Sequence, residues 1–305
     1  MHIPDGFLAT PVWATLDAIA APAVFTVARR AQRGFDESKV PLLGVMGAFV
    51  FAAQMINFPV GVGTTGHLVG GALLACTLGP GAATLVMSVI IAIQALVFQD
   101  GGILALGPNI LNMAVLGVLA GYLPYYLWGA TRRRRAAIFA GGAFSVMVSA
   151  LFALSELLLS GVRMPGPVLG LSLALFAVSA VLEGAITLAV MQALEALQPD
   201  FIRQPGKVPA RRAVFAAVGL AAVLLAAVGV MFAAAAPDGI QQLGLETGIA
   251  AHVRTLFSTP FSGYQTAFLQ SAWVRKASSG LAGLAIVYAA CIGFGRVAAS
   301  RNRSL

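Results

Sequence analysis

Residues 132–160 have the sequence RRRRAAIFAGGAFSVMVSALFALSELLLS, four arginines followed by an apolar run with a single carboxylate, Glu156. A helix needs about 20 apolar residues to cross the hydrocarbon core of a membrane. A helix that is apolar on every face belongs in a membrane or in a large protein core. The stretch therefore predicts a membrane-spanning helix over 136–160, with a basic cluster at its start.

The whole chain shares this apolar character. Of its 305 residues 59% are hydrophobic and only 10% are charged, with a mean hydropathy of +0.89; soluble domains are about a quarter charged. The net charge of +8 does not indicate nucleic-acid binding, because the basic residues form short clusters between apolar runs. Cys76 and Cys291 lie in apolar segments, which predicts buried thiols without a disulfide or zinc role.

We expect an all-α membrane protein with nine spans, some of them short or broken. A Gly79-Pro80-Gly81 turn separates the third span from the fourth. The expected spans are 11–30, 41–58, 67–80, 82–98, 109–129, 136–160, 167–194, 212–236 and 277–298.

The basic residues predict the orientation of these spans. With the N-terminus outside, all but four of the 19 Lys and Arg residues fall on the inner side, and this bias marks the cytoplasmic face. The C-terminus is then also inside. The four exceptions are Arg163, Arg254, Arg275 and Lys276.

The chain divides into two units at a polar segment, 196–211, which contains Pro199, Pro205 and Pro209. This composition predicts an inner linker. We expect residues 1–195 to form a seven-span core, and residues 212–305 to form an auxiliary unit of two spans with an outer loop over 237–276.

The first residues, Met1-His2-Ile3-Pro4-Asp5-Gly6-Phe7-Leu8, carry a candidate metal chelator. The Met1 amine, the His2 amide and His2 Nδ1 can close a five-membered and a six-membered ring around one ion. Three such nitrogens suit a square-planar ion such as Ni(II) or Cu(II) and leave one position open. Either remaining histidine, His67 or His252, could fill it. The alternative is an ordinary histidine on a flexible end.

Two features favour the chelator over the flexible end. No cleavable signal peptide is apparent, and the bulky His2 should keep Met1 in place once its formyl group is removed. The glycine-rich loop 59–66, which ends at His67, falls on the same outer face as Met1. The loop 99–109 also lies there, and either roofs the site or is only a polar turn.

Each of several other polar residues has both a functional and a purely structural interpretation. Asp5 could support the N-terminal loop by hydrogen bonding, or belong to a plain Pro-Asp-Gly turn. Carboxylates inside apolar runs are functional candidates by default, or else make packing hydrogen bonds. His252 could pass metal inward, although a solvated loop histidine is the favoured interpretation. The carboxylates in question are Asp17, Glu156 and Glu183.

Three motifs together resemble the NikM/CbiM family, the substrate-binding (S) components of energy-coupling-factor transporters for nickel and cobalt. They are the Met-His-Ile-Pro-Asp-Gly-Phe-Leu start, residues 63–67 (Gly-Thr-Thr-Gly-His) and residues 107–113 (Gly-Pro-Asn-Ile-Leu-Asn-Met). The resemblance covers roughly 1–195. It implies seven transmembrane helices and an N-terminus that plugs into the bundle.

The resemblance also implies a ligand set and partners. Met1, through its amine, His2, through its amide and imidazole, and His67 would bind the metal. Thr65 and Asn109, which lie in the motifs, become candidates for supporting the ligands. Small residues on the first helix, Ala14 and Ala18, resemble the face that meets a transmembrane coupling subunit, although chance could supply them. Two ATPases would complete the transporter.

The C-terminal unit resembles the NikN-type, or PDGLE, auxiliary domain. Its sequence at 237–241 is Pro-Asp-Gly-Ile-Gln, so the final Leu-Glu of that motif is replaced. The departure leaves any role of this position open. A fused unit of this type favours nickel over cobalt.

The leading hypothesis is therefore the metal-capture subunit of an ATP-driven nickel importer in a bacterial cytoplasmic membrane. No Walker A sequence occurs, so ATP would be hydrolysed by partners. Cobalt is the first alternative. An intramembrane metalloenzyme would need an open coordination position and a base, and no His-Glu-x-x-His occurs. A secondary permease driven through the intramembrane carboxylates is the third possibility.

Overall fold

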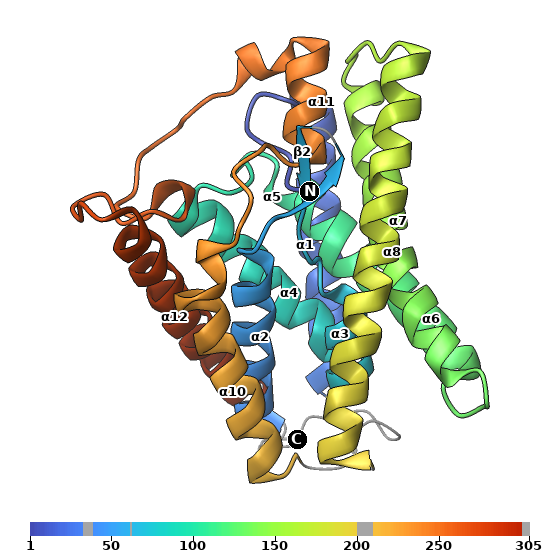
Figure 1. Cartoon of the computed structure of the whole chain (residues 1–305). Coiled ribbons are helices and arrows are strands. Elements are labelled where there is room, and N and C mark those ends of the chain that lie inside the picture. The colour runs from blue at the N-terminus through green and yellow to red at the C-terminus, as the bar shows by residue number, and fades with distance from the viewer. Residues whose placement is uncertain (33–38, 62, 200–209, 301–305) are drawn as a thin grey trace.

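A computed structural model describes residues 1–32, 39–61, 63–199 and 210–300. Within them, seven helices are long and apolar enough to cross a membrane, which supports a multi-pass membrane protein. They are α1 (Thr10–Gln32), α4 (Pro80–Ile93) with its extension η2 (Gln94–Phe98), the continuous run α5 (Leu106–Asn109), η3 (Ile110–Leu116) and α6 (Gly117–Trp128), α7 (Arg134–Leu159), α8 (Gly166–Leu197), α10 (Arg212–Ala227) with η4 (Gly229–Met231), and α12 (Ala272–Ser300) (Figure 1).

The second and third expected spans are shorter than the sequence suggests. α2 (Val40–Gln54) ends before the expected residue 58, and α3 covers only Gly71–Leu78. Eight residues of helix extend about 12 Å, less than half of a hydrocarbon core of about 30 Å. The prediction of a helix over 67–80 is therefore correct only for its second part.

Residues 67–70 stay outside the helix because other side chains bind their backbone. The Glu183 carboxylate accepts hydrogen bonds from the amides of Val69 and Gly70, at 2.7 and 2.8 Å. Gln54 Nε2 donates to the Val69 carbonyl at 2.7 Å. Helix starts leave unpaired N–H groups, so a buried carboxylate from α8 stabilises the start of α3.

The other two intramembrane carboxylates also hold elements together. Asp17 of α1 accepts from the Gly107 amide at 2.6 Å. Glu156 of α7 accepts from Asn112 Nδ2 at 2.8 Å. Among the interpretations that the sequence leaves open, these contacts favour packing hydrogen bonds.

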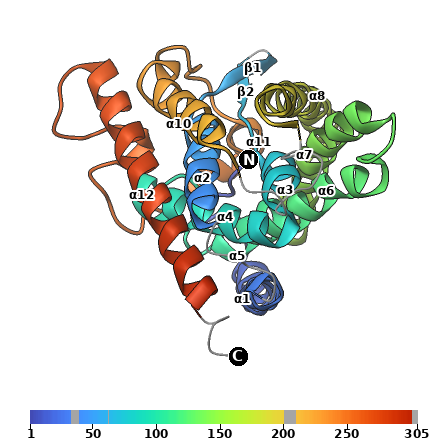
Figure 2. The same ribbon diagram turned by 90° about the horizontal axis from the view of Figure 1, so that it is seen from below.

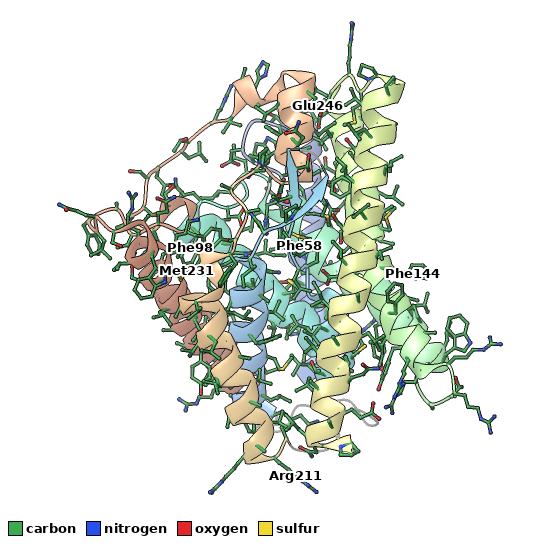
Figure 3. The ribbon with its side chains drawn as sticks, viewed as in Figure 1. Phe58, Phe98, Phe144, Arg211, Met231 and Glu246 are labelled. Carbon is green, nitrogen blue, oxygen red and sulfur yellow. The ribbon has the colours of Figure 1, made fainter. Side chains whose placement is uncertain are left out.

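The two ends of the helix bundle carry different elements and different numbers of arginines. The N-terminus, a short antiparallel hairpin of β1 (Phe58–Gly61) and β2 (Thr64–Gly66), and α11 (Gly239–Thr247) share one end, where Glu246 also lies. Arg211 and the arginine-rich α6–α7 turn lie toward the other end (Figure 3). This segregation agrees with the predicted basic face, and its assignment to the cytoplasm stays a prediction. Of the basic residues counted in the sequence, Arg33, Arg203, Lys207, Arg301 and Arg303 lie outside the described residues.

The C-terminal helices pack directly on the core. Both α10 and α12 lie against α2 (Figure 1). Glycines permit this approach, because a Cβ on Gly283 of α12 would lie 2.3 Å from the Phe51 ring of α2. Beyond α11, the 237–276 loop contains two short turns, η5 (Ile249–His252) and η6 (Ser262–Tyr264).

α1 lies at the edge of the bundle, as the view along its axis shows (Figure 2). Only 6% of its span is buried, against 61% for α4. Ala18 is exposed and Ala14 is half-buried. A face of this helix therefore remains uncovered in the isolated chain.

Candidate metal centre

The N-terminal residues fold back into the molecule. Met1, His2, Ile3 and Phe7 are all buried. Asn109 binds Ile3 on both sides, accepting from its amide at 2.8 Å and donating to its carbonyl at 3.1 Å. This arrangement excludes the flexible-end interpretation.

Asp5 contributes a second attachment. Its carboxylate accepts hydrogen bonds from the amides of Ile103 and Leu104, at 3.0 and 2.8 Å. The Gly102 amide donates to the Ile3 carbonyl at 2.8 Å. The loop 99–105 thus covers the N-terminal residues, which favours the roof over the plain turn.

The Met1 amine lies 2.8 Å from His67 Nε2. The other ring nitrogen, His67 Nδ1, lies 2.9 Å from the Leu68 carbonyl. A carbonyl only accepts, so Nδ1 carries the proton and the Nε2 lone pair faces the amine. Burial, followed by the nearby charges of the amine and His2, lowers the pKa of His67 to about 4. The ring is therefore neutral near pH 7.

The His2 ring stacks on the His67 ring, with centroids 5.7 Å apart and planes 10° apart. It is 2% exposed, and neither of its nitrogens has a hydrogen-bond partner. Asp100 Oδ1 lies 3.3 Å from His2 Nδ1, an ion-pair distance without hydrogen-bond alignment. Buried polar atoms rarely remain unpaired. The lack of hydrogen bonds to either nitrogen makes His2 a candidate for binding a ligand.

Two residues that sequence reasoning missed extend the site on the His2 side. Tyr264 donates to Asp100 Oδ2 at 2.6 Å. Burial alone would raise the pKa of Asp100, but the neighbouring His2 and this hydrogen bond bring the pKa well below its usual value. Burial and the Asp100 charge raise the pKa of Tyr264 well above its usual value. The pair is therefore a carboxylate held by a neutral hydroxyl.

A third missed residue, Asp238, reaches the amine itself. Its Oδ2 accepts from the Met1 nitrogen at 2.5 Å. Burial acts to raise the pKa of Asp238, but the charge of the amine, with His67, lowers it overall. The sequence singled out residues 237–241 only for their resemblance to the PDGLE motif, with no role assigned to Asp238. Nothing local to it indicated a partner at residue 1.

Thr65 connects the site to the C-terminal unit. Its amide donates to the Pro237 carbonyl and its hydroxyl to the Ala236 carbonyl, both at 2.9 Å. The His252 side chain is exposed. The His252 carbonyl instead covers Gly6, where a Cβ would lie 1.9 Å away. This position agrees with the favoured interpretation of a loop histidine.

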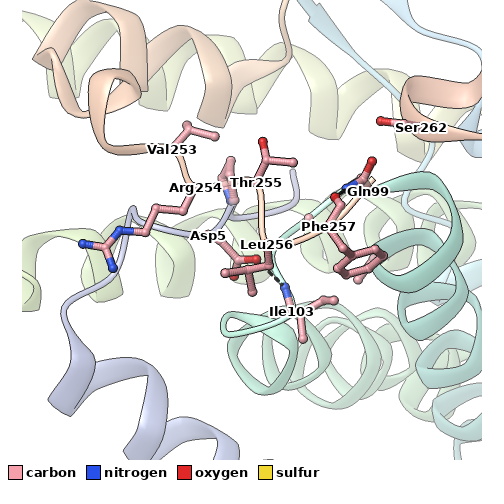
Figure 4. Close-up of a pocket in the computed structure, with 12 residues that line it drawn as sticks. Asp5, Gln99, Ile103, Val253, Arg254, Thr255, Leu256, Phe257 and Ser262 are labelled. Carbon is pink, nitrogen blue, oxygen red and sulfur yellow. Dashed lines mark hydrogen bonds between the residues drawn. The ribbon is translucent and has the colours of Figure 1, made fainter. Parts of the chain in front are cut away.

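A cavity of about 170 Å³ lies between the N-terminal loop and the 237–276 loop (Figure 4). Asp5 and Ile103 line it together with Leu256 and Phe257 of the 237–276 loop. The Arg254 side chain extends away from the cavity. In the described ranges, no three His, Cys, Asp or Glu side chains form a metal-binding cluster.

The helices and the buried first residues define a class, that of multi-pass membrane proteins whose own N-terminus is inserted into the fold. Residues 2–201 match the family model described as "Cobalt uptake substrate-specific transmembrane region", and the chain belongs to this CbiM family.

Relatives agree with this assignment. The chain is 42% identical over 217 residues to a protein of Archaeoglobus fulgidus that is provisionally named fused nickel transport protein NikMN, covering 68% of this chain and 70% of that protein. It is 29% identical to the fused nickel transport protein NikMN of Rhodobacter capsulatus, covering 95% of each. A crystal structure of a truncated transition metal transporter is similar, with a TM-score of 0.57 and 32% identity, covering 65% of this chain and 99% of that one.

Proposed function

We propose that this protein is the substrate-specific membrane subunit of an ATP-driven, energy-coupling-factor importer of nickel. Nickel enters from the outer face as substrate. It binds in a nearly planar site of four nitrogens, supplied by the Met1 amine, the His2 amide, His2 Nδ1 and His67 Nε2. The proposal requires a free Met1 amine in the mature protein.

The observation that carries the proposal is the 2.8 Å distance between the Met1 nitrogen and His67 Nε2. Nitrogens at adjacent corners of a square around a metal, with bonds of about 2 Å, lie roughly 2.8 Å apart. The unpaired nitrogens of the buried His2 supply a further donor from the next residue. The hydrogen-bonded amine and imidazole thus support two corners of the plane.

Binding exchanges protons for metal. The amine and the His2 amide must each give up a proton before they can coordinate, whereas His67 already presents a lone pair. The Asn109 and Asp5 contacts fix the main chain that carries these donors. The donors are therefore largely preorganised, which lowers the cost of binding.

Transport needs energy from partners. A membrane coupling subunit with two ATPases would drive release of the ion toward the cytoplasm. The uncovered face of α1, with Ala14 and Ala18, suits contact with such a subunit, because small residues allow helices to approach closely.

Nickel is preferred because the relative named as a fused nickel transport protein matches over 95% of both chains, including the C-terminal unit. Cobalt is the second candidate, favoured by the description of the family model. Competition between Ni(II) and Co(II) for the purified protein decides between them. The secondary permease is less well supported, because Asp17, Glu156 and Glu183 serve as packing acceptors.

The proposal is tested by measuring nickel binding to the purified full chain, after mass spectrometry has verified an unblocked Met1. Replacement His67→Ala removes one corner of the plane, and we expect affinity to fall about 100-fold with a changed visible spectrum. His252→Ala is the control and should bind like the wild type. Equal binding by both variants contradicts the proposed ligand set.

A further inference from the structure

Asp238 belongs to the C-terminal unit, yet its carboxylate lies inside the candidate site. Oδ2 is 2.5 Å from the Met1 nitrogen and 3.9 Å from His67 Nε2. The residue is only 7% exposed. A buried charge of this kind is costly unless it is paired, so the contact with the amine is a built feature of the fold.

The second oxygen of the same carboxylate fixes its direction. Oδ1 accepts from the amides of Ile240 and Gln241, each at 2.9 Å, at the start of α11. Gln241 also faces back to the Asp238 amide, which completes a capping box. Glutamine serves here as well as the glutamate of the PDGLE motif, so the departure seen in the sequence preserves the turn.

The core holds this turn from the other side. β2 carries Thr65, which binds the Ala236 and Pro237 carbonyls, and His67 follows two residues later. A Cβ on Gly239 would lie 2.9 Å from the Phe176 ring of α8. One strand of the core therefore sets the positions of both His67 and Asp238.

Among the described residues, Asp238 is the carboxylate that hydrogen-bonds to the amine. Asp100 lies instead beside His2 Nδ1. The two carboxylates occupy different sides of the site and cannot replace each other. The amine is therefore held from both units, by His67 of the core and by Asp238 of the C-terminal unit.

We propose that Asp238 is a positioning residue for nickel, and that the C-terminal unit thereby supplies part of the metal site. This proposal rests on the proposed function. A coordinated amine keeps two N–H groups, and Oδ2 accepts one of them, which directs the nitrogen lone pair toward the ion. Carboxylates that hold metal ligands in this way typically change affinity about 10- to 100-fold when they are replaced.

The test compares nickel affinity and the visible circular dichroism of bound nickel in the full chain. Asp238→Asn keeps an oxygen for the α11 cap and removes the charge. We expect a 10- to 100-fold loss of affinity, with the spectrum at saturating nickel retained because the four nitrogens are unchanged. Asp238→Glu restores a carboxylate and should recover part of the affinity. Glu246→Gln removes an exposed charge from the same helix and should have no effect.

The outcomes separate this proposal from the proposed function. Wild-type affinity in Asp238→Asn, together with loss in His67→Ala, overturns the role of Asp238 and leaves the four-nitrogen site intact. Equal losses in the Asn and Glu variants, with lower thermal stability of the metal-free proteins, overturn it also, since only the turn would then matter. Unchanged binding in His67→Ala overturns the site itself.

Discussion

Met1 brings together residues that are far apart in the sequence. Its nitrogen contacts His67 and Asp238, 66 and 237 residues away. His67 offers a nitrogen lone pair, and Asp238 offers a negative charge. The buried amine thus has two hydrogen-bond acceptors, His67 Nε2 and Asp238 Oδ2. A bound metal would use the same lone pair of His67.

Acid should destabilise the metal-free protein through His67. Its pKa in the folded state is about 4, below the usual 6.5, so the unfolded chain binds the proton more readily between these values. Stability contributed by this group is present above about pH 6.5 and is lost as the pH falls toward 4. Thermal unfolding in detergent should show a falling Tm over this window.

The variant His67→Gln should have a smaller decrease in Tm over the same window. His252→Gln is the control, because its exposed ring should leave the pH profile unchanged. Identical profiles in the wild type and His67→Gln would contradict the assignment of the acid effect to His67.

Met1, His2 and His67 could be selected from the sequence, because a chelate can be recognised in two adjacent residues and the charge bias places His67 on the same face. The structure brings all three together. Their role in metal binding stays a prediction. Asp238 was not selected because its contact depends on how the C-terminal unit docks. The Asp238 side chain caps α11, and this local role would by itself explain an aspartate at that position. No local pattern around it pointed to residue 1.

At the level of elements, the non-helical segment 67–70 before α3 depends on Glu183. Glu183→Ala leaves the buried amides of Val69 and Gly70 unpaired, and each should cost roughly 1–3 kcal/mol. We expect a large decrease in Tm. Nickel binding should also weaken, because His67 belongs to the same segment. Glu195→Ala is the control, because its ion pair with Arg134 is partly exposed and contributes little. Equal Tm values for both variants would contradict this role.

The contact between the N-terminal loop and the 237–276 loop depends on Gly6. Its φ of +93° is costly for other residues, and a Cβ there would overlap the His252 carbonyl. Gly6→Ala should displace the loop, increase its cleavage by protease and weaken nickel binding. Gly63→Ala is a matched control, since Gly63 also has a positive φ, of +71°, but a Cβ there would meet no other atom within 4 Å. Equal protease sensitivity in the two variants would contradict a clash at Gly6.

The hydrophobic pattern located the long helices well, because an apolar run of 20 residues has few alternatives. It failed over 67–70, because the residue that binds this backbone, Glu183, lies on α8, more than 100 residues further along the chain. Residues 237–276 were expected as one outer loop. Its helix α11 is short and depends on the capping box at Asp238.

At the scale of the whole molecule, the end bearing the N-terminus should face outward. Glu246→Cys should react with a membrane-impermeant maleimide in intact cells, whereas Ala130→Cys, in the α6–α7 turn, should react only after permeabilisation. The native Cys76 and Cys291 are 0% and 2% exposed and should stay unlabelled in both. The opposite labelling pattern would reverse the orientation.

The docking of residues 237–276 on the first residues has a consequence for gene organisation. If the two units were separate polypeptides, Asp238 would reach the Met1 amine only at the cellular concentration of its own chain. A shared chain replaces that encounter with an intramolecular one, at an effective concentration on the order of millimolar for a short linker. It also fixes the ratio of the two units at one to one. Fusion therefore ensures that every copy of the site is made with its own carboxylate.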